Sequence, residues 1–343
     1  MKLTNVHVAI LGGLAVILAT TAAILYLPEK PELSDSREGA LLVQGLDLTQ
    51  VAEIRLTTKD NKVMLKRQND RFVVANRNSY PASTDKVNEL LIKCLEIRCA
   101  ERVATGEAGH ADLGVAEDSD NATTVRLFDT DGNELVGLVI GKHAERGGGV
   151  YVRLLDEDKV YATEESLWLS PGPTSYMKTE LITVKKDDIV QVDVTIGEDQ
   201  YTLTKADDGK TALQPMPPDK VKKQREVDGV FGALTSLRFT DVHVAGDITA
   251  EQWDTYRCQL SNHLTYVVDV TKTKAKDDEG QEKSYCKLRA IGPTRAQIEA
   301  SSRIGRDEDE EALKKKDAVL QAMDQAQDFN SRHAGWAYEV SNW

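Results

Sequence analysis

The chain has 343 residues, with 43 basic and 56 acidic side chains, so its formal net charge at pH 7 is −13. A chain this acidic is a poor match for nucleic acids and anionic lipid surfaces, whose phosphates attract basic patches. Apolar residues make up 41% and charged residues 29% of the sequence, which is typical of a folded body in water. Aromatic residues make up only 6%, which argues against a stacking platform for sugars or bases.

An uncharged, proline-free apolar segment covers residues 8–27. A helix of about 20 residues crosses the roughly 30 Å hydrocarbon core of a bilayer once. Lys2 is the only charge before this segment, and acidic residues outnumber basic ones directly after it, which favours a cytoplasmic tail and an extracytoplasmic body. A cleaved signal peptide is the alternative, although its apolar core is usually about 7–15 residues long. We therefore expect residues 1–27 to form a cytoplasmic tail and a retained single-pass anchor.

Small side chains recur along the predicted anchor at Gly12, Ala15, Ala19 and Ala23. Such a stripe lets two helices approach closely in lipid, so it predicts a packing face for another membrane helix. The alternative is that glycine and alanine are simply frequent in membrane helices.

A polar stalk with two prolines covers residues 28–40, and the folded body begins at Leu41. Short apolar runs between turn residues then predict β-strands. In the first half of the body these strands lie near residues 51–56, 63–65, 72–74, 98–103, 124–128, 135–140, 150–155 and 159–162.

The body shows an internal duplication. A predicted helix at about 85–96 has the apolar stripe Val87, Leu90, Leu91, Cys94 and Ile97. The same pattern returns 140 residues later, in a predicted helix at about 225–236, at Val227, Val230, Phe231, Leu234 and Leu237. We therefore expect an α+β fold in which a mostly antiparallel β unit with one helix occurs twice, at residues 41–183 and 184–343.

The second repeat carries a predicted helical insertion at residues 307–329, which begins with a run of acidic residues. Its apolar stripe consists of Val319, Leu320, Met323 and Ala326. This stripe covers either the sheet of its own repeat or a partner. A last strand is expected around Gly335–Val340.

Four cysteines occur, and Cys94 falls on the apolar stripe of a predicted helix, where it is expected to be a buried core residue. Cys258 and Cys286 flank a predicted strand and are candidates for a disulfide in an oxidising compartment. The sequence leaves open whether any of the cysteines is oxidised.

Other local patterns favour structure over chemistry. The segment Asp129–Glu134 has calcium-ligand residue types, but its Asp-Gly pair between two strands favours a hairpin turn. Gly147–Gly149 resembles a phosphate loop but lacks the following lysine and helix, which favours a loop tip. The six histidines form no HExxH motif, and no serine lies in a G-x-S-x-G elbow. We expect no cofactor, no metal and no catalytic activity.

Four short motifs remain, and they are Leu46–Leu56, Tyr80–Ala82, the pair Ile140-Gly141 and Gly335–Tyr338. Together they resemble a bacterial family known as domain of unknown function 4340. The chain departs from the family pattern where a tryptophan is common in the third strand, since it has Phe72 there and Thr211–Leu213 in the second copy. The resemblance implies a membrane-anchored protein with no catalytic residues to transfer. Some members resemble auxiliary components of an ABC transporter linked to gliding motility.

Two functional hypotheses follow. The first is an accessory or scaffold subunit, anchored in the bacterial inner membrane with its bulk in the periplasm, which docks to other membrane or envelope proteins. The second is an extracytoplasmic ligand-binding protein or hydrolase with a site between the two repeats. The bilayer is a partner in either case, nucleic acid is not, and the oligomeric state is left open.

Overall fold

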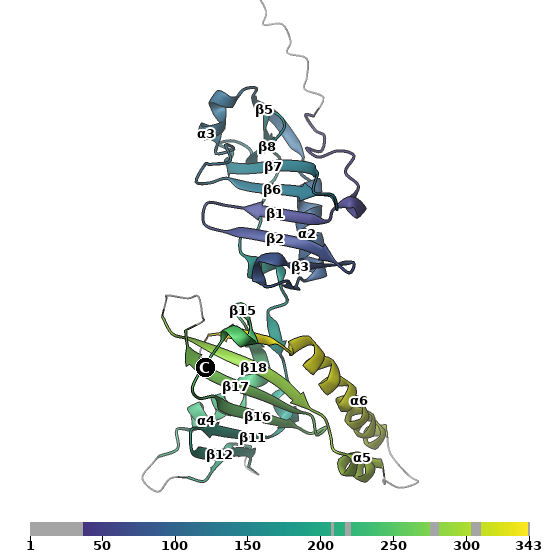
Figure 1. Cartoon of the computed structure of the whole chain (residues 1–343), viewed down its shortest axis with the longest axis vertical. Helices are drawn as coiled ribbons and strands as arrows, with labels where there is room; N and C mark the ends of the chain where they lie inside the picture. Colours follow the sequence, from purple (N-terminus) through teal and green to yellow (C-terminus); the bar gives the residue numbers. More distant parts are fainter. Residues whose placement is uncertain (1–36, 207–208, 217–220, 275–280, 303–309, 342–343) are drawn as a thin grey trace, which may run out of the picture. The chain divides into compact units, whose positions relative to one another are not determined.

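The computed structural model describes residues 37–341, except 207–208, 217–220, 275–280 and 303–309 (Figure 1). The predicted anchor at residues 8–27 and most of the stalk therefore lie outside the described residues. Among the helices that the structure does describe, none is both long enough and apolar enough to cross a membrane.

The described residues form a mixed α+β protein with mainly antiparallel sheets, which confirms the predicted fold class at this level. The described part of the chain contains five α-helices. They are α2 (Thr84–Leu95), α3 (His110–Leu113), α4 (Gln224–Phe231), α5 (Arg295–Ser302) and α6 (Glu310–His333).

The first sheet has nine strands in the order β4-β3-β2-β1-β6-β7-β8-β9-β5. Its strands are β1 (Glu53–Thr57), β2 (Lys62–Gln68), β3 (Arg71–Val74), β4 (Tyr80–Pro81), β5 (Cys99–Ala104), β6 (Thr123–Phe128), β7 (Glu134–His143), β8 (Val150–Leu154) and β9 (Val160–Thr163). Strand β1 pairs antiparallel with β2, so that Ile54 lies opposite Leu65 and Leu56 opposite Val63. All four of these side chains are buried, as the alternation of apolar residues predicts.

The second sheet has eight strands in the order β13-β12-β11-β16-β17-β18-β19-β15, and β10 and β14 form a separate pair. The strands are β10 (Glu180–Ile182), β11 (Ile189–Ile196), β12 (Asp199–Lys205), β13 (Thr211–Gln214), β14 (Leu237–Arg238), β15 (Asp241–Val244), β16 (Asp254–Leu260), β17 (Thr265–Thr273), β18 (Lys283–Ile291) and β19 (Trp336–Val340). The last strand therefore begins within the segment predicted for it.

The chain forms two compact units. Of the described residues, the first contains those up to Asp47 together with Leu91–Val125 and Leu135–Leu169, and the second contains Leu48–Leu90, Arg126–Glu134 and those from Ser170 onward. A core cluster of the first unit consists of Val115, Ala122, Val139, Tyr151, Val160 and Ala162. A core cluster of the second consists of Ile248, Tyr285 and Ala337.

The helical stripe predicted for residues 85–96 is confirmed, because its five apolar side chains are all buried. Its counterpart in α4 is only partly as predicted. The α-helix ends at Phe231, and residues Ala233–Ser236 continue as a 3-10 turn. Of the five predicted stripe residues, Val230 is 38% exposed, and the other four are buried. Gly229 and Gly232 give a physical reason for the end of the helix, since glycine disfavours a continued α-helix.

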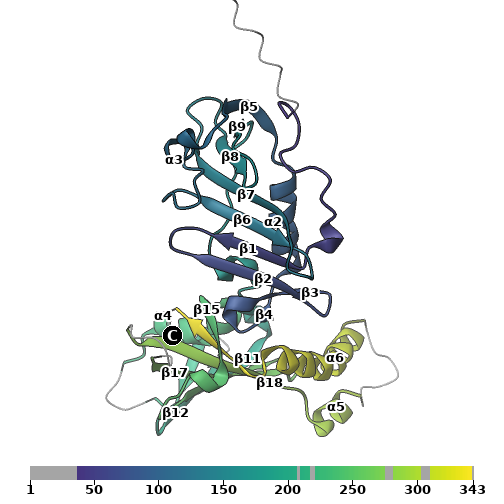
Figure 2. The same ribbon diagram turned by 45° about the horizontal axis from the view of Figure 1, so that its top comes forward.

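Helix α6 runs along β18 of the second sheet (Figures 1 and 2). The Asn330 side chain donates a 2.8 Å hydrogen bond to the carbonyl of Ala290 and accepts a 2.7 Å hydrogen bond from its N–H. The helix therefore covers the second sheet, which belongs to the same predicted repeat, and this is one of the two options left open by the sequence. Its buried face consists of Val319, Ala322, Ala326, Phe329 and His333, whereas the predicted stripe members Leu320 and Met323 are half-exposed.

Candidate functional site

The residues predicted to pack in the membrane, Gly12, Ala15, Ala19 and Ala23, all lie outside the described residues. Nothing in the described structure bears on their packing, and they stay a prediction.

The predicted disulfide between Cys258 and Cys286 is wrong. Both are buried free thiols on β16 and β18, with β17 between them. Cys258 lies opposite Tyr266 on β17, whereas Cys286 lies opposite Val270, four residues further along. Neighbouring strands are about 4.8 Å apart, so two strand spacings alone exceed the roughly 7 Å limit between the Cα atoms of a disulfide.

Cys94 is a buried core residue, as predicted. Burial raises the pKa of its thiol to about 12, because an apolar environment disfavours the thiolate. The same cause raises the pKa of Cys258 to about 12. Since the thiolate is the reactive form of cysteine, these side chains are unsuited to nucleophilic chemistry.

The segment Asp129–Glu134 is a hairpin turn. The Asp129 carboxylate accepts hydrogen bonds from the N–H groups of Asp131 and Asn133, at 2.9 and 2.8 Å, and from the Asn133 side chain at 2.9 Å. These bonds, first of all that from the Asn133 side chain, lower the pKa of Asp129. Gly132 supplies the positive φ, at 85°. The carboxylate is therefore occupied in holding the turn together.

The glycine loop between β7 and β8 is also a structural feature. Gly147 and Gly148 have φ values of 84° and 76°, in the left-handed region that favours glycine. A Cβ atom on Gly149 would lie only 2.0 Å from the Thr163 carbonyl oxygen, so a side chain is excluded there. The Thr163 hydroxyl accepts a 2.9 Å hydrogen bond from the N–H of Val150. This close approach explains the third glycine without a phosphate ligand.

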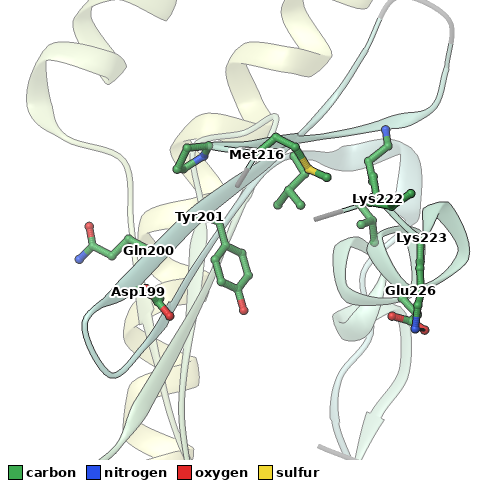
Figure 3. A pocket seen from close by; sticks show the side chains of 11 residues that line it. Asp199, Gln200, Tyr201, Met216, Lys222, Lys223 and Glu226 are labelled. Atoms are coloured by element: carbon green, nitrogen blue, oxygen red, sulfur yellow. Dashed lines mark hydrogen bonds and ion pairs between the residues drawn. The ribbon is translucent and has the colours of Figure 1, made fainter. Parts of the chain in front are cut away.

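The candidate binding site is a pocket of about 400 Å³ in the second unit, where β12 and β13 meet the segment that leads into α4 (Figure 3). Figure 3 shows the Tyr201 ring directed into the space between the two strands and the segment around Lys222. Apolar atoms dominate the lining. The lining residues are Asp199, Gln200, Tyr201, Leu213, Pro215, Met216, Val221, Lys222, Lys223, Glu226 and Val227.

A hydrogen-bond cluster around Thr211 fixes the wall of this pocket. The Lys222 ammonium donates to the Thr211 carbonyl at 3.0 Å, and the Gln224 amide donates to the same oxygen at 3.2 Å. Asp228 accepts hydrogen bonds from the Thr211 hydroxyl and, at 2.9 Å, from Gln224. These bonds, with that from Thr211 first, lower the pKa of Asp228. The start of α4 is thus tied to β13.

Two apolar side chains at this pocket are exposed. Val221 is 89% exposed and Met216 is 39% exposed. On the polar side, the Lys223 ammonium lies 3.0 Å from the Glu226 carboxylate, so this lysine and glutamate largely offset each other. Burial and the nearby Asp199 and Asp254 carboxylates raise the pKa of Tyr201, which keeps its hydroxyl protonated as a hydrogen-bond donor. The pocket therefore offers apolar contact surface, the neutral Tyr201 hydroxyl, the Lys223–Glu226 ion pair and the charged side chains of Asp199 and Lys222.

Two further pockets are more polar. One of about 630 Å³ in the first unit is bordered by Lys93, Arg98 and the 72% exposed Trp168. The other, of about 540 Å³, lies on the second sheet around Asp193, Tyr201 and Arg257. Each of the three pockets lies within one of the predicted repeats. In the part of the chain that the structure describes, no three His, Cys, Asp or Glu residues are placed to hold a metal ion.

Sequence reasoning missed the pocket, because its walls come from segments that are separate in the chain. A local indication was present in the run from Leu213 to Met216, where apolar residues and a proline interrupt the strand pattern. This apolar run, followed a few residues later by Val221 and then by Lys222 and Lys223, is unusual on the surface of a charged protein.

The fold and pocket together define an α+β protein with a mainly apolar pocket at the edge of its second sheet. Residues 73–259, more than half of the chain, match the family described as Domain of unknown function (DUF4340). The chain belongs to this family, as the resemblance of its motifs indicated. No curated protein and no solved structure matches the chain.

Proposed function

We propose that this chain is a non-enzymatic accessory subunit, anchored in the bacterial inner membrane, whose periplasmic body docks to another membrane or envelope protein. The observation that supports this function is the pocket beside α4, where Met216 and Val221 are exposed next to an apolar lining. An auxiliary role beside an ABC transporter is the form of this function that the family resemblance favours.

Apolar side chains left in water carry a free-energy cost that a partner removes. Burying one such side chain fully contributes about 1.5–3 kcal/mol. Protein interfaces concentrate their binding energy in a few side chains that fill well-packed pockets. A leucine or phenylalanine of the partner would fill the space between Tyr201 and Val227, against exposed Val221. Positively and negatively charged side chains of the pocket, such as Lys222 and Glu226, suit the polar main chain on either side of the partner's leucine or phenylalanine.

We further propose that residues 41–183 and 184–343 are duplicated repeats. The order β1-β2-β3 in the first, followed by the short β4 and then α2, corresponds to β11-β12-β13 followed by α4 in the second. The first two strands of each set pair antiparallel, and each third strand pairs with the second. Duplication would give the accessory subunit two related β surfaces with different side chains.

The docking pocket is tested by a charge placed at its exposed valine. Val221→Asp should reduce the recovery of co-purifying partners from native membranes at least about tenfold, because a buried unpaired carboxylate opposes association. Val190→Asp is the matched control, since Val190 is 49% exposed on β11 and does not line the pocket. Equal recovery of partners with both variants would rule out the pocket as the docking site.

The anchor is tested separately by Ala15→Leu with Ala19→Leu. We expect the doubly substituted chain to insert and fold but to lose membrane partners, because bulky side chains keep helices apart. Unchanged recovery of the same partners would show that the anchor is only a tether. A turnover of any substrate that is lost on changing a pocket residue would overturn the non-enzymatic function.

A further inference from the structure

Strand β13 forms one edge of the second sheet, and the candidate pocket lies beside it. Leu213 on β13 lies opposite Leu203 on β12, and Tyr201 lies two residues before Leu203, so that all three side chains share one face of the sheet. Leu213 and Tyr201 both line the pocket. The pocket therefore opens on this face at the sheet edge, between the strands and the segment around Lys222 (Figure 3).

The register of β13 decides which of its main-chain groups are directed away from the sheet. At the start of the hairpin, the N–H of Ala206 donates a 2.9 Å hydrogen bond to the carbonyl of Lys210. Bonded and non-bonded residue pairs alternate along an antiparallel ladder. Ala212, two residues after Lys210, is therefore bonded to β12. The main-chain groups of Thr211 and Leu213 are directed away from β12, at the open edge.

These two outward positions differ in what occupies them. The Thr211 carbonyl accepts hydrogen bonds from the Lys222 ammonium at 3.0 Å and from the Gln224 amide at 3.2 Å. Within the described part of the chain, no group is hydrogen-bonded to the main-chain N–H or C=O of Leu213. Leu213 is partly exposed, and Gln214 and Met216 after it are exposed. One donor and one acceptor of the sheet edge are thus open next to the pocket.

We infer that the docking partner supplies an extended segment, which adds a strand to the second sheet beside Leu213 and places one apolar side chain in the pocket. The inference rests on the proposed docking function and specifies the form of the partner at the same site. One residue of the segment donates its N–H to the Leu213 carbonyl and accepts the Leu213 N–H, as in strand addition generally. Its side chain then lies on the same face as that of Leu213, where the pocket opens.

The open main-chain groups of Leu213 favour an extended occupant over a helix, because a helix has bonded its own main-chain groups internally. A second copy of this chain fits the edge poorly. If two β13 strands paired antiparallel about Leu213, Pro215 of each copy would lie opposite Thr211 of the other, and proline has no N–H to donate. The Thr211 carbonyl is also already bonded to Lys222. The occupant is therefore a segment of a different protein, with free N–H groups and a side chain such as leucine.

The test uses linear nonapeptides displayed on phage and selected on the full chain in detergent. Counter-selection on Val221→Asp retains only peptides that need the pocket. With the retained peptide bound, hydrogen exchange of the Leu213 amide should slow at least about tenfold, because this N–H becomes hydrogen-bonded. The amide of Ala212 is the internal control, since it is already bonded to β12 and should change little.

The two main-chain bonds are tested from both sides by fluorescence anisotropy of the labelled peptide. N-methylation at one peptide position should weaken binding at least about tenfold, and this change leaves the protein untouched. Leu213→Pro should weaken binding equally, since it removes the outward N–H but no bond to β12, and proline is tolerated at such edge positions. Leu213→Ala is the matched control, because it shortens the same side chain and keeps the N–H. Circular dichroism checks the folding of both variants.

The inference is overturned if the bound peptide leaves Leu213 unprotected, tolerates N-methylation at every position, or binds Leu213→Pro as tightly as Leu213→Ala. A selection that yields no pocket-dependent peptide overturns it too. In each case the proposed function still stands when Val221→Asp reduces the recovery of membrane partners relative to Val190→Asp. Equal recovery with these two variants defeats the proposed function and this inference together. A dimer of the full chain that disappears with Leu213→Pro would assign the edge to a second copy instead.

Discussion

The Nδ1 atom of His333 lies 2.7 Å from the hydroxyl oxygen of Tyr338, and both side chains are buried. His333 is the last residue of α6, and Tyr338 lies on β19, so this hydrogen bond closes the turn between the helix and the last strand. Gly335 makes the turn possible with a φ of 83°. The ring of Phe329 lies 4.3 Å from that of His333 and completes an aromatic cluster.

We predict that this histidine makes the protein less stable in mild acid. Burial, and secondly the nearby Arg332, lower the pKa of His333 from 6.5 to about 4. The unfolded chain therefore takes up a proton at a higher pH than the folded chain does. The stability that comes from keeping His333 uncharged is fully present above pH 6.5 and is lost as the pH falls toward 4. Its upper bound is about 3 kcal/mol. Urea denaturation at pH 7.5 and pH 5 measures the difference.

The variant His333→Gln should be less stable at pH 7.5 but should have a smaller loss of stability between pH 7.5 and 5. His143→Gln serves as the control, since His143 is exposed on β7, and should keep the original pH dependence. If His333→Gln has the same pH dependence as the unchanged protein, the titrating group lies elsewhere.

A second prediction concerns the glycine loop. Gly149→Ala should lower the free energy of unfolding by about 2 kcal/mol or more, because the new methyl group would collide with the Thr163 carbonyl, which is backbone and cannot move aside alone. Gly147→Ala meets no atom within 4 Å and is strained only by its φ of 84°, so a loss of about 1 kcal/mol is expected. Denaturant midpoints compare the two variants, and equal losses would contradict the contact at Gly149.

A third prediction follows from the four buried thiols. A thiol reagent such as Ellman's should react with none of the cysteines in the folded protein on a scale of minutes, and with all four after denaturation without reductant. Two thiols missing from the denatured protein would show a disulfide that the strand order forbids for Cys258 and Cys286. Because an oxidising compartment permits disulfides, the test is most decisive on protein isolated from the native envelope.

Local periodicity was sufficient to predict which side of many elements is buried. The stripe Val87, Leu90 and Cys94 in α2 and the alternation of Ile54 with Leu56 in β1 are buried as expected. Spacing along one element translates directly into a face, because a helix repeats every 3.6 residues and a strand every two. The Asp129 turn was predictable for the same reason, since its contacts are local.

Other features depend on which segments meet, and these were decided only by the tertiary structure. Cys258 and Cys286 flank β17 in sequence, but the sheet places that strand between them and keeps them apart. Val230 lies within α4 but is 38% exposed, whereas Leu234 and Leu237, which follow the end of the helix, are buried. In α6, the sequence marked Leu320 together with Val319 as one stripe, whereas docking on β18 buries only the latter. Apolar patterning indicates which face of an element tends to be buried, while strand order and helix docking determine which neighbouring element buries it.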